Sequence, residues 1–320
     1  MTRAGAQALT VLAAPLNIHT LRALENGPME LLDLRRAVGS PPESTMRVYT
    51  RALEGLDILE RRRSNEFPAT ARYTLTPVGE SLLKVADFLQ EWLRAAPDGP
   101  ILLGSVAARN GTKALIGGWS SNIVRAVAAR AVSLTDLNML IPKISYPTLE
   151  RKLGAMRTAK LVSPQPGAGR GTPYGATEWL RQAVIPLTSA AGWERQFVPE
   201  PLAQIGRLDV EAAFLLSIPL MVMDPGITGT CRLSVEVRAG SEPALAGVIV
   251  GIEKGKVMSC TSRLEGESQA SASGSAVAWM RQMNGGPPGH LEISGSFPLA
   301  EAITGALGAL GVLPGGMSRN

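Results

Sequence analysis

The stretch Ser145-Tyr-Pro-Thr-Leu-Glu-Arg-Lys-Leu-Gly-Ala-Met156, followed by a Pro- and Gly-rich loop and by Pro173-Tyr-Gly-Ala-Thr-Glu-Trp179, decides the fold. Its leucines and Met156 recur at spacings of four and three residues, which predicts a short helix with one apolar face. Arg151 and Lys152 lie on the polar side of this helix. A strand then begins at Leu161, and the chain returns at Tyr174 after the loop. Helix, strand, loop and strand in this order predict the second half of a winged helix-turn-helix.

The same order of elements occurs about a hundred residues earlier. At a constant offset of 103, Leu53 lies over Met156 and Ile58-Leu59 over Leu161-Val162. Beyond the loop the offset is 101, and it pairs Tyr73 with Tyr174, Thr76 with Thr177 and Trp92 with Trp193. The change of two falls inside a hairpin, where loops tolerate length variation. The chain is therefore predicted to contain two copies of one unit.

Length and charge agree with several domains. A chain of 320 residues exceeds one ordinary hydrophobic core, and we expect domains at 1–100, 101–203 and 204–320. Residues 1–200 contain 24 Lys and Arg against 17 Asp and Glu, whereas residues 201–320 contain 8 against 10. The positive charge therefore belongs to the half with the repeats, which favours an anionic partner there.

In the first copy we expect helices at residues 6–26, 29–38 and 46–56, the last one capped by Ser44 or Thr45. This third helix carries Arg47 and Arg51 on its exposed face, and the chain leaves it into Glu60-Arg61-Arg62-Arg63. Arginines beside such a helix suit phosphate contact, because each cation releases counterions from the duplex. A solvated hairpin on a basic protein is the alternative interpretation.

A longer helix follows each predicted wing, at residues 81–94 and about 178–195. Each contains a tryptophan, Trp92 or Trp193, on an apolar side that the small unit itself cannot cover. We expect these two helices to pair within the chain as a pseudo-dimer that presents two recognition helices together. In the alternative, each tryptophan packs only on its own domain.

The order of elements, the segment from Arg47 to Leu59-Glu-Arg61, and Tyr174-Gly-Ala-Thr-Glu-Trp179 with Gly192-Trp193 resemble the HxlR-type winged-helix transcriptional regulators. The resemblance covers residues 8–195 in two passes and implies binding of double-stranded DNA. The cysteine that some members use for sensing is missing, with Leu16 and Ser120 near the comparable places. The second copy has few cations, so it is the better candidate for a copy that has lost DNA binding. The candidate DNA-binding residues are Arg47, Arg51, Arg61, Arg62, Arg63, Arg72, Arg151, Lys152, Arg157 and Arg170.

From about Gly206 the pattern changes to an apolar helix over 210–223, an alternating strand at 231–238, a hairpin around residues 253–255, a helix at 276–283, a last strand at 290–295 and a last helix at 298–310. With Gly289-His-Leu-Glu-Ile-Ser-Gly-Ser-Phe-Pro-Leu-Ala300, residues 205–313 resemble the sterol-carrier-protein-like lipid-binding domain, which implies an apolar tunnel. The candidate liners for a hydrophobic small molecule are Leu220, Met221, Met223, Met258, Met280 and Met283. Ordinary core packing of each Met, and a domain that binds nothing, are the alternatives.

The predicted fold class is mainly α with small β: two tandem winged helix-turn-helix domains followed by an α+β sterol-carrier-like domain. No catalytic motif, metal site or cofactor is expected, because Cys231, Cys260, His19 and His290 lack partners at a useful spacing. The run from Ala8 to Leu16 is too short and broken for a signal or membrane segment, so we expect a cytoplasmic protein.

Three functions remain at this point. The first is a DNA-binding regulator that responds to a hydrophobic small molecule. The second is a small-molecule binding or self-resistance protein on a regulator scaffold that no longer binds DNA. An enzyme is the least favoured, and homodimerisation of the whole chain stays open.

Overall fold

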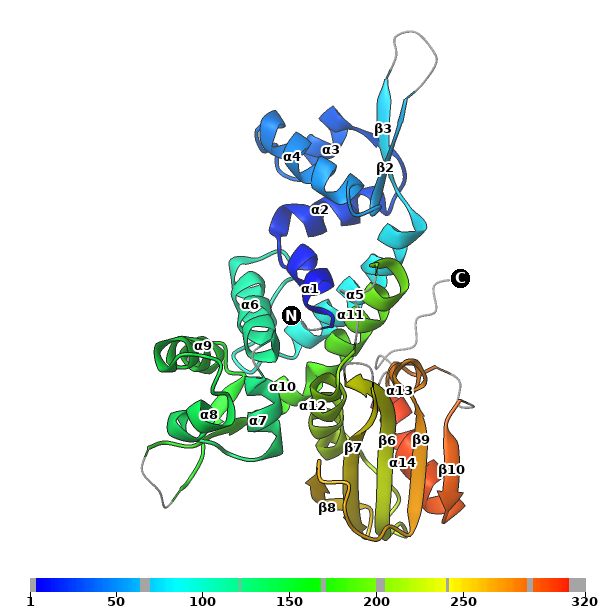
Figure 1. Ribbon diagram of the computed structural model, residues 1–320. Coiled ribbons are helices and arrows are strands. Elements are labelled where there is room, and N and C mark those ends of the chain that lie inside the picture. Colours follow the sequence, from blue (N-terminus) through cyan, green and yellow to red (C-terminus); the bar gives the residue numbers. More distant parts are fainter. Residues whose placement is uncertain are drawn as a thin grey trace.

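The computed structural model describes residues 4–63, 70–120, 122–167, 171–199, 205–239, 242–286 and 290–310. Its elements form three groups along the chain (Figure 1). We name residues 15–98 the first unit, residues 123–197 the second unit and residues 205–310 the C-terminal unit. Two further helices, α1 (Ala6–Leu12) and α6 (Val106–Ser120), pack against each other between the units, and α1 also packs on α11 of the second unit (Figure 1).

The first unit is a winged helix-turn-helix. Its elements in chain order are α2 (Pro15–Leu24), β1 (Met29–Glu30), α3 (Leu31–Ala37), α4 (Glu43–Glu54), β2 (Leu59–Arg63), β3 (Ala71–Leu75) and α5 (Pro77–Arg94). The three strands form an antiparallel sheet in the order β1-β3-β2. Fully buried side chains from every helix, among them Leu21, Leu34, Met46 and Leu82, make the core below this sheet.

Several predicted helix boundaries in this part of the chain are wrong, and two of the differences involve proline. The helix predicted at 29–38 begins only at Leu31, because Met29 and Glu30 form β1. The expected single helix 6–26 is split at Ala14, which is extended because Pro15 restricts the residue before it and starts α2. The third helix begins at Glu43 with Pro42 as its N-cap, so neither Ser44 nor Thr45 caps it. Ser44 therefore lies on the exposed face of α4.

The second unit has a similar order of elements. They are α7 (Ile123–Ala129), α8 (Leu134–Leu140), α9 (Tyr146–Thr158), β4 (Val162–Pro164), β5 (Tyr174–Ala176), α10 (Glu178–Gln182) and α11 (Val184–Phe197). An isolated bridge joins Val132 to Tyr174, as β1 joins β3 through Met29 and Tyr73 in the first unit. The helix expected at 178–195 is broken at Ala183, three residues before Pro186 in the first turn of α11.

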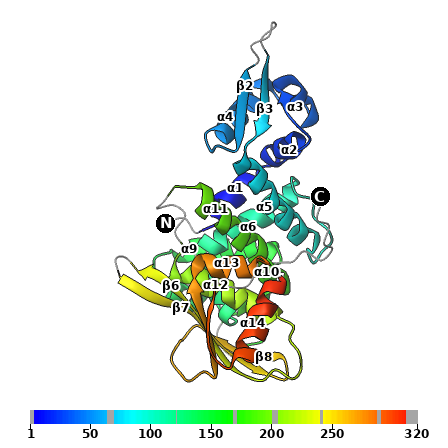
Figure 2. The ribbon, with the colours of Figure 1, turned by 90° about the vertical axis from the view of Figure 1, so that its right-hand side faces the viewer.

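The C-terminal unit is a five-stranded sheet with helices on one face. The strands are β6 (Gly229–Ala239), β7 (Glu242–Glu253), β8 (Lys256–Thr261), β9 (Ala270–Ser275) and β10 (Glu292–Gly295), in the order β10-β9-β6-β7-β8. Only the β6/β9 pair is parallel among the described strands. Helices α12 (Arg207–Ser217), α13 (Ala276–Met283) and α14 (Phe297–Leu310) cover one side of the sheet (Figures 1 and 2).

Alternation in β6 buries the expected side of this strand, Cys231, Leu233, Val235 and Val237. The helix predicted over 210–223, with a break at Pro219, ends at Ser217 and passes into a 3-10 turn, η1 (Ile218–Leu220), around that proline. Strand β9 was not predicted, since its Ala-Ser alternation contains no large apolar residue. The space between sheet and helices is filled by Phe214 and Trp279, whose rings pack edge to face at 4.9 Å.

Buried polar contacts join the C-terminal unit to the second unit. Glu211 of α12 is fully buried, and its carboxylate accepts hydrogen bonds from Arg125 of α7 at 2.5 Å and from Arg207 at 2.7 Å. The Thr188 hydroxyl of α11 lies 3.0 Å from Oδ1 of Asn284, just after α13. A buried carboxylate needs such partners, so the two units are held in a defined arrangement.

Candidate nucleic-acid interface

Helix α4 has one buried and one exposed face. Met46, Thr50 and Leu53 point into the core, whereas Ser44, Arg47, Val48 and Arg51 are exposed at the spacing of one helix face. Val48 is 63% exposed, which is unusual for an aliphatic side chain in the middle of a helix. Ser44 and Val48 were missed in the sequence, although their spacing from Arg47 and Arg51 could have identified them. This face offers cations, a hydroxyl and a methyl group together.

Arg47 is held by an exposed partner of its own helix. Its Nε and Nη2 donate to Oε1 of Glu43 at 2.9 and 2.6 Å. Both side chains are about half exposed, and an ion pair of this kind contributes roughly 0–1 kcal/mol. Arg47 therefore changes partner at little cost when a better acceptor approaches.

Strands β2 and β3 place further arginines beside α4. Arg61, Arg62 and Arg63 are all exposed, and Arg62 lies directly opposite Arg72 in the register of the two strands. Like charges directly opposite each other destabilise a strand pair. Glu60 and Glu30 reduce this repulsion, at 2.9 Å from Arg62 Nη2 and 4.0 Å from Arg72 Nε. A phosphate backbone would reduce it further.

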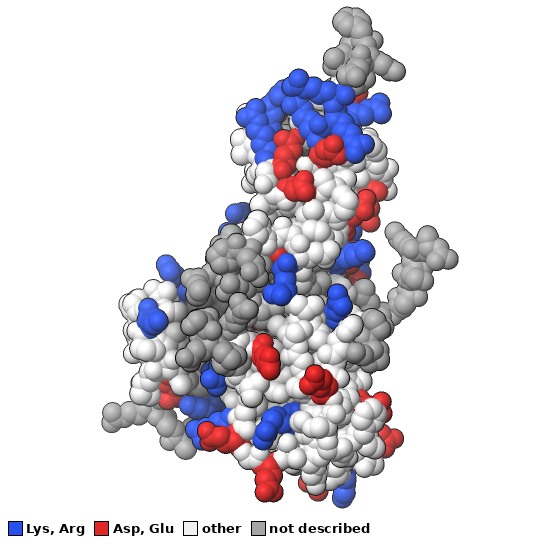
Figure 3. Space-filling model, turned by 45° about the vertical axis from the view of Figure 1, so that its right-hand side comes forward, with Lys and Arg blue, Asp and Glu red and all other residues white. Residues whose placement is uncertain are grey.

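Arg61 lies on the other face of the wing. Its guanidinium carbon is 5.9 Å from the ring centroid of Tyr73, a largely buried residue opposite Arg61 in β3. The cation–π contact restricts this side chain. Figure 3 shows Lys and Arg gathered at the end of the molecule that the first unit forms, beside the tip of the wing. The first unit therefore has the charge and shape of a surface that binds duplex DNA.

The predicted residues of the second unit are placed differently. Arg151 and Lys152 line a cleft between α9 and α6, and Nζ of Lys152 donates to the carbonyl of Gly117 at 3.1 Å. Burial, together with the charge of Arg151, lowers the pKa of Lys152. Arg157 Nη1 lies 3.4 Å from the hydroxyl of Tyr174, and Arg170 falls outside the described residues. These cations do not form a counterpart of the Arg47 face.

The two long helices that follow the wings pack against each other, α5 along α11. Trp92 Nε1 donates to the carbonyl of Trp179 at 2.8 Å, and Trp193 Nε1 donates to the carbonyl of Val78 at 3.0 Å. In addition, Trp179 stacks on Trp92 with centroids 4.5 Å apart and donates to its carbonyl at 2.8 Å. Trp92 and Trp193 both contact the opposite unit, and Trp179 was missed as a member of this interface.

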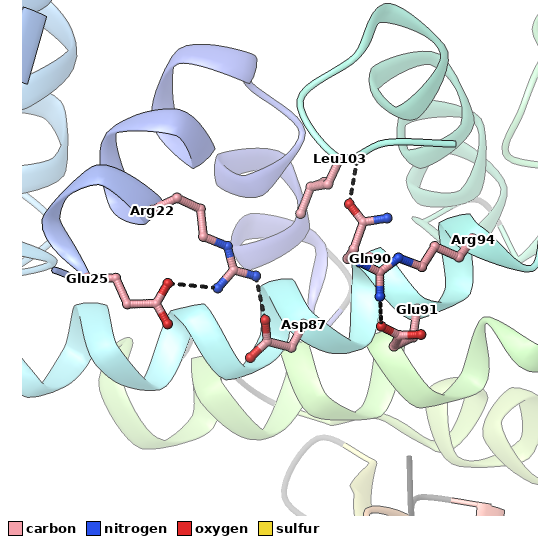
Figure 4. A network of polar contacts seen from close by, with 7 residues as sticks. All are labelled: Arg22, Glu25, Asp87, Gln90, Glu91, Arg94 and Leu103. Carbon is pink, nitrogen blue, oxygen red and sulfur yellow. Dashed lines mark hydrogen bonds and ion pairs between the residues drawn. The ribbon is translucent and has the colours of Figure 1, made fainter. Parts of the chain in front are cut away.

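Arg22, Asp87 and Gln90 fix α5 against α2 and against the chain that leads to α6 (Figure 4). Arg22 of α2 forms ion pairs with Asp87 of α5 and with Glu25. Gln90 of α5 accepts from the Leu103 amide at 2.8 Å and donates to the Ile101 carbonyl at 3.1 Å. The connection from α5 to α6 is thereby anchored to the same helix that contacts α11.

A small apolar cavity of about 40 Å³ lies where the C-terminal unit meets α6 and α11. We name it the junction cavity; its lining includes Trp119, Ala191, Ala213, Phe214, Trp279, Met280 and Met283. The other predicted liners do not reach it: Leu220 and Met223 are half-buried in and after η1, and Met221 is buried there. The prediction that Met258 lines a cavity is wrong, because this side chain is 65% exposed on the edge strand β8.

The thiols and acids of the described residues are not arranged for metal binding. No group of three or more His, Cys, Asp or Glu side chains in the described ranges could hold a metal ion. Burial raises the pKa of Cys231 and of Cys260 to about 12, so both stay protonated thiols at neutral pH. Of the helices in the described part of the chain, none has the length and apolarity required to cross a membrane.

Comparison with known proteins bears on the first unit. One solved structure, described as a proposed transcriptional regulator of the MarR family from Enterococcus faecalis V583, is 26% identical over 27% of this chain and 78% of that chain, with a TM-score of 0.26. No curated protein matches the chain. Residues 15–98, from the start of α2 to the loop after α5, match the family described as HxlR-like helix-turn-helix.

Proposed function

We propose that the chain is a DNA-binding transcriptional regulator that contacts duplex DNA through its first unit. The observation that carries the proposal is the exposed face of α4 beside an arginine-rich wing, within the residues that match the HxlR-like family. In winged helix-turn-helix proteins the helix corresponding to α4 enters the major groove and the wing lies along the backbone.

Each exposed group has a role in this arrangement. Arg47 and Arg51 are long enough for bidentate contacts with guanine O6 and N7, and the Val48 methyl groups suit the methyl group of thymine. The arginines of β2 and β3 neutralise phosphates, so binding weakens as salt rises. Ser44 near the start of α4 is placed for a phosphate oxygen.

The second unit then serves as the partner that the first unit needs for its long helix. Support comes from the two indole hydrogen bonds, each of which runs from a tryptophan of one unit to a carbonyl of the other. The two donors, Trp92 and Trp193, lie 101 residues apart in the sequence, and so do the two acceptors, Val78 and Trp179. Such an exchange is what a two-fold relation between similar units produces. We therefore propose two tandem winged-helix copies that form an intrachain pseudo-dimer, with DNA contacts made by the first copy.

The ligand response is assigned to the junction cavity. This cavity touches α11 of the second unit and α12 and α13 of the C-terminal unit, so an apolar molecule bound there would act on the arrangement of the units. Its aromatic and thioether walls suit a small planar or acyl group. The C-terminal unit would in this case act as a lipid-carrier-like module that senses rather than transports.

The experiment is a gel-retardation assay of the full chain on its own upstream DNA at two salt concentrations, with and without an organic extract of the host. Specific binding that falls with salt and is released by the extract supports a ligand-controlled regulator. If the extract does not change DNA binding, the proposed ligand response is wrong and the proposed DNA binding stands. Absence of DNA binding, with small molecules that co-purify, supports the second candidate, a small-molecule binding or self-resistance protein. The position of Arg151 and Lys152 in the lining of a cleft favours this candidate.

A further inference from the structure

A second, larger hollow lies between α6, α9 and the connection after α5. Its volume is about 1050 Å³, close to that of the largest ordinary small-molecule sites, which have roughly 300–1,000 Å³. We name it the α6–α9 cleft. It is distinct from the junction cavity, since the two share no lining residue.

Small residues keep this cleft open. Besides Asn110 and Lys113, α6 lines the cleft with small residues at helical spacing, and α9 adds one more small residue: Ala107, Gly111 and Ala114 on α6, and Ala155 on α9. The helices meet closely further along, where a Cβ on Gly118 would lie 2.5 Å from Sδ of Met156. The far wall includes Ile101, which the Gln90 side chain holds by its carbonyl (3.1 Å). The cleft is therefore built by fixed elements.

Its lining combines apolar and cationic side chains. The ring of Trp179 closes the inner end, and a Cβ on Gly111 would lie 3.8 Å from its Cη2 atom. Four cations line the cleft against one carboxylate: Lys113, Arg151, Lys152 and Lys160 against Asp98. Asp98 forms an ion pair with Lys160, with 3.6 Å between Oδ2 and Nζ. The cleft therefore keeps an excess of positive charge.

Lys152 is the least solvated of these cations. Burial, and after it the charge of Arg151, lowers its pKa. An anion placed between Arg151 and Lys152 would favour the charged form. The charge distribution thus complements a ligand with one anionic end.

We infer that the α6–α9 cleft binds an amphipathic organic anion, whose bulky apolar body lies against α6 and Trp179 and whose carboxylate, sulfonate or phosphate group lies among Arg151, Lys152 and Lys113. The inference does not depend on DNA binding, because it rests on the shape and charge of this cleft alone. A neutral apolar molecule fits the same walls but forms no ion pair with the cations, so we expect the anion to bind more tightly.

The test is a fluorescence titration of the full chain with 8-anilinonaphthalene-1-sulfonate and, in parallel, with the uncharged N-phenyl-1-naphthylamine. Ala114→Trp fills the cleft and should weaken binding of both probes by about tenfold or more. The double variant Arg151→Gln/Lys152→Gln should weaken the sulfonate about tenfold and leave the neutral probe within about twofold. Arg109→Gln, which removes a cation of α6 that does not line the cleft, is the matched control and should change neither.

Ala213→Leu in the junction cavity separates the two hollows, because it should leave the sulfonate bound in the α6–α9 cleft unchanged. If Ala114→Trp does not fold, as judged by circular dichroism, the smaller Ala107→Leu takes its place. Sulfonate binding that survives both cleft variants, or that is lost only with Ala213→Leu, overturns the inference. Loss of sulfonate binding in Arg151→Gln/Lys152→Gln, with binding of the neutral probe retained, supports the inference. This holds whether or not the protein binds DNA.

Discussion

The first and second units have similar interiors and different surfaces. Thr76 caps α5 by accepting from the amide of Gly79, and Thr177 caps α10 by accepting from the amide of Leu180, both at 3.2 Å. The amides of Thr76 and Thr177 also donate to the carbonyls of Ile58 and Leu161, both at 3.1 Å. These contacts determine how helix and wing meet, so each unit needs them in order to fold.

The surfaces have diverged where the first unit offers cations. Glu150 and Gly154 stand 103 positions after Arg47 and Arg51, and Pro164-Gln-Pro166 stands at the same distance after Arg61-Arg62-Arg63. Met139, which is 67% exposed, takes the place of Arg36. A carboxylate on α9 repels phosphate, and prolines cannot replace the wing arginines. The comparison shows that two units with similar packing contacts can differ in the charge of the corresponding faces.

Removal of the exposed arginine side chains of α4 should have the largest effect and tests whether only the first unit binds DNA. Arg47→Ala/Arg51→Ala should weaken specific DNA binding by roughly 2–6 kcal/mol if both reach bases. The matched change in the second unit, Arg151→Ala/Arg157→Ala, should alter it by less than about 1 kcal/mol. Titration of labelled operator by fluorescence anisotropy measures both. Equal losses for the two double variants would show that both units bind DNA.

The two indole hydrogen bonds test the likeness of the interiors. Trp92→Phe and Trp193→Phe each remove one donor and leave a buried carbonyl, of Trp179 or of Val78, without it. Each should lower the free energy of unfolding by about 1–3 kcal/mol. Urea unfolding followed by circular dichroism measures the change. A large effect of one substitution beside none for the other would contradict a two-fold relation between the units.

The wing arginines give a smaller effect. Arg62→Gln and Arg72→Gln should each reduce the slope of log affinity against log salt by about one, with only a modest loss of affinity. Neither should destabilise the protein, because the two cations oppose each other across the strands. Arg195→Gln on α11 is the control cation outside the first unit. A slope that stays constant in the wing variants would remove the wing from the DNA interface.

The interiors differ at one buried position, which pH can reveal. Glu194 stands 101 residues after the fully buried Leu93, and its carboxylate accepts from the amides of Gly5 at 2.7 Å and Ala8 at 2.9 Å. Burial raises the pKa of Glu194, although the hydrogen bonds from the backbone of Ala8, Gly5 and Gln7 oppose this. The carboxyl group therefore stays protonated to higher pH in the folded state than in the unfolded state, where the pKa of a glutamate is about 4.3.

Between these two pKa values the folded state binds more protons, so the stability that this group contributes falls as pH rises. Glu194→Gln removes the titration and keeps one acceptor oxygen. Relative to wild type, the variant should gain stability from about pH 4 towards neutrality, as measured by urea unfolding in steps of pH. A difference that is independent of pH would mean that the carboxyl group titrates alike in both states.

Local patterns predicted more than long-range packing. The apolar spacing of α9 and the alternation of β6 identified both elements, because each buries one face whatever it packs against. The break at Pro15 could have been read from the proline itself. Strand β9 could not, since its Ala and Ser residues become a strand only through pairing with β6 and β10. The α6–α9 cleft, the role of Trp179 and the exposure of Met258 all depend on contacts between distant segments.

The packing of α5 against α11 has a consequence for assembly. In a homodimer, the association of two such helices depends on protein concentration, whereas here the two helices belong to one polypeptide and the connecting chain keeps them at a high effective concentration. Dilution therefore does not separate them. A cell that makes only a few copies of this protein would still hold every copy in its assembled form, and the amount of protein would set how many DNA sites are occupied without changing the state of the molecule that occupies them.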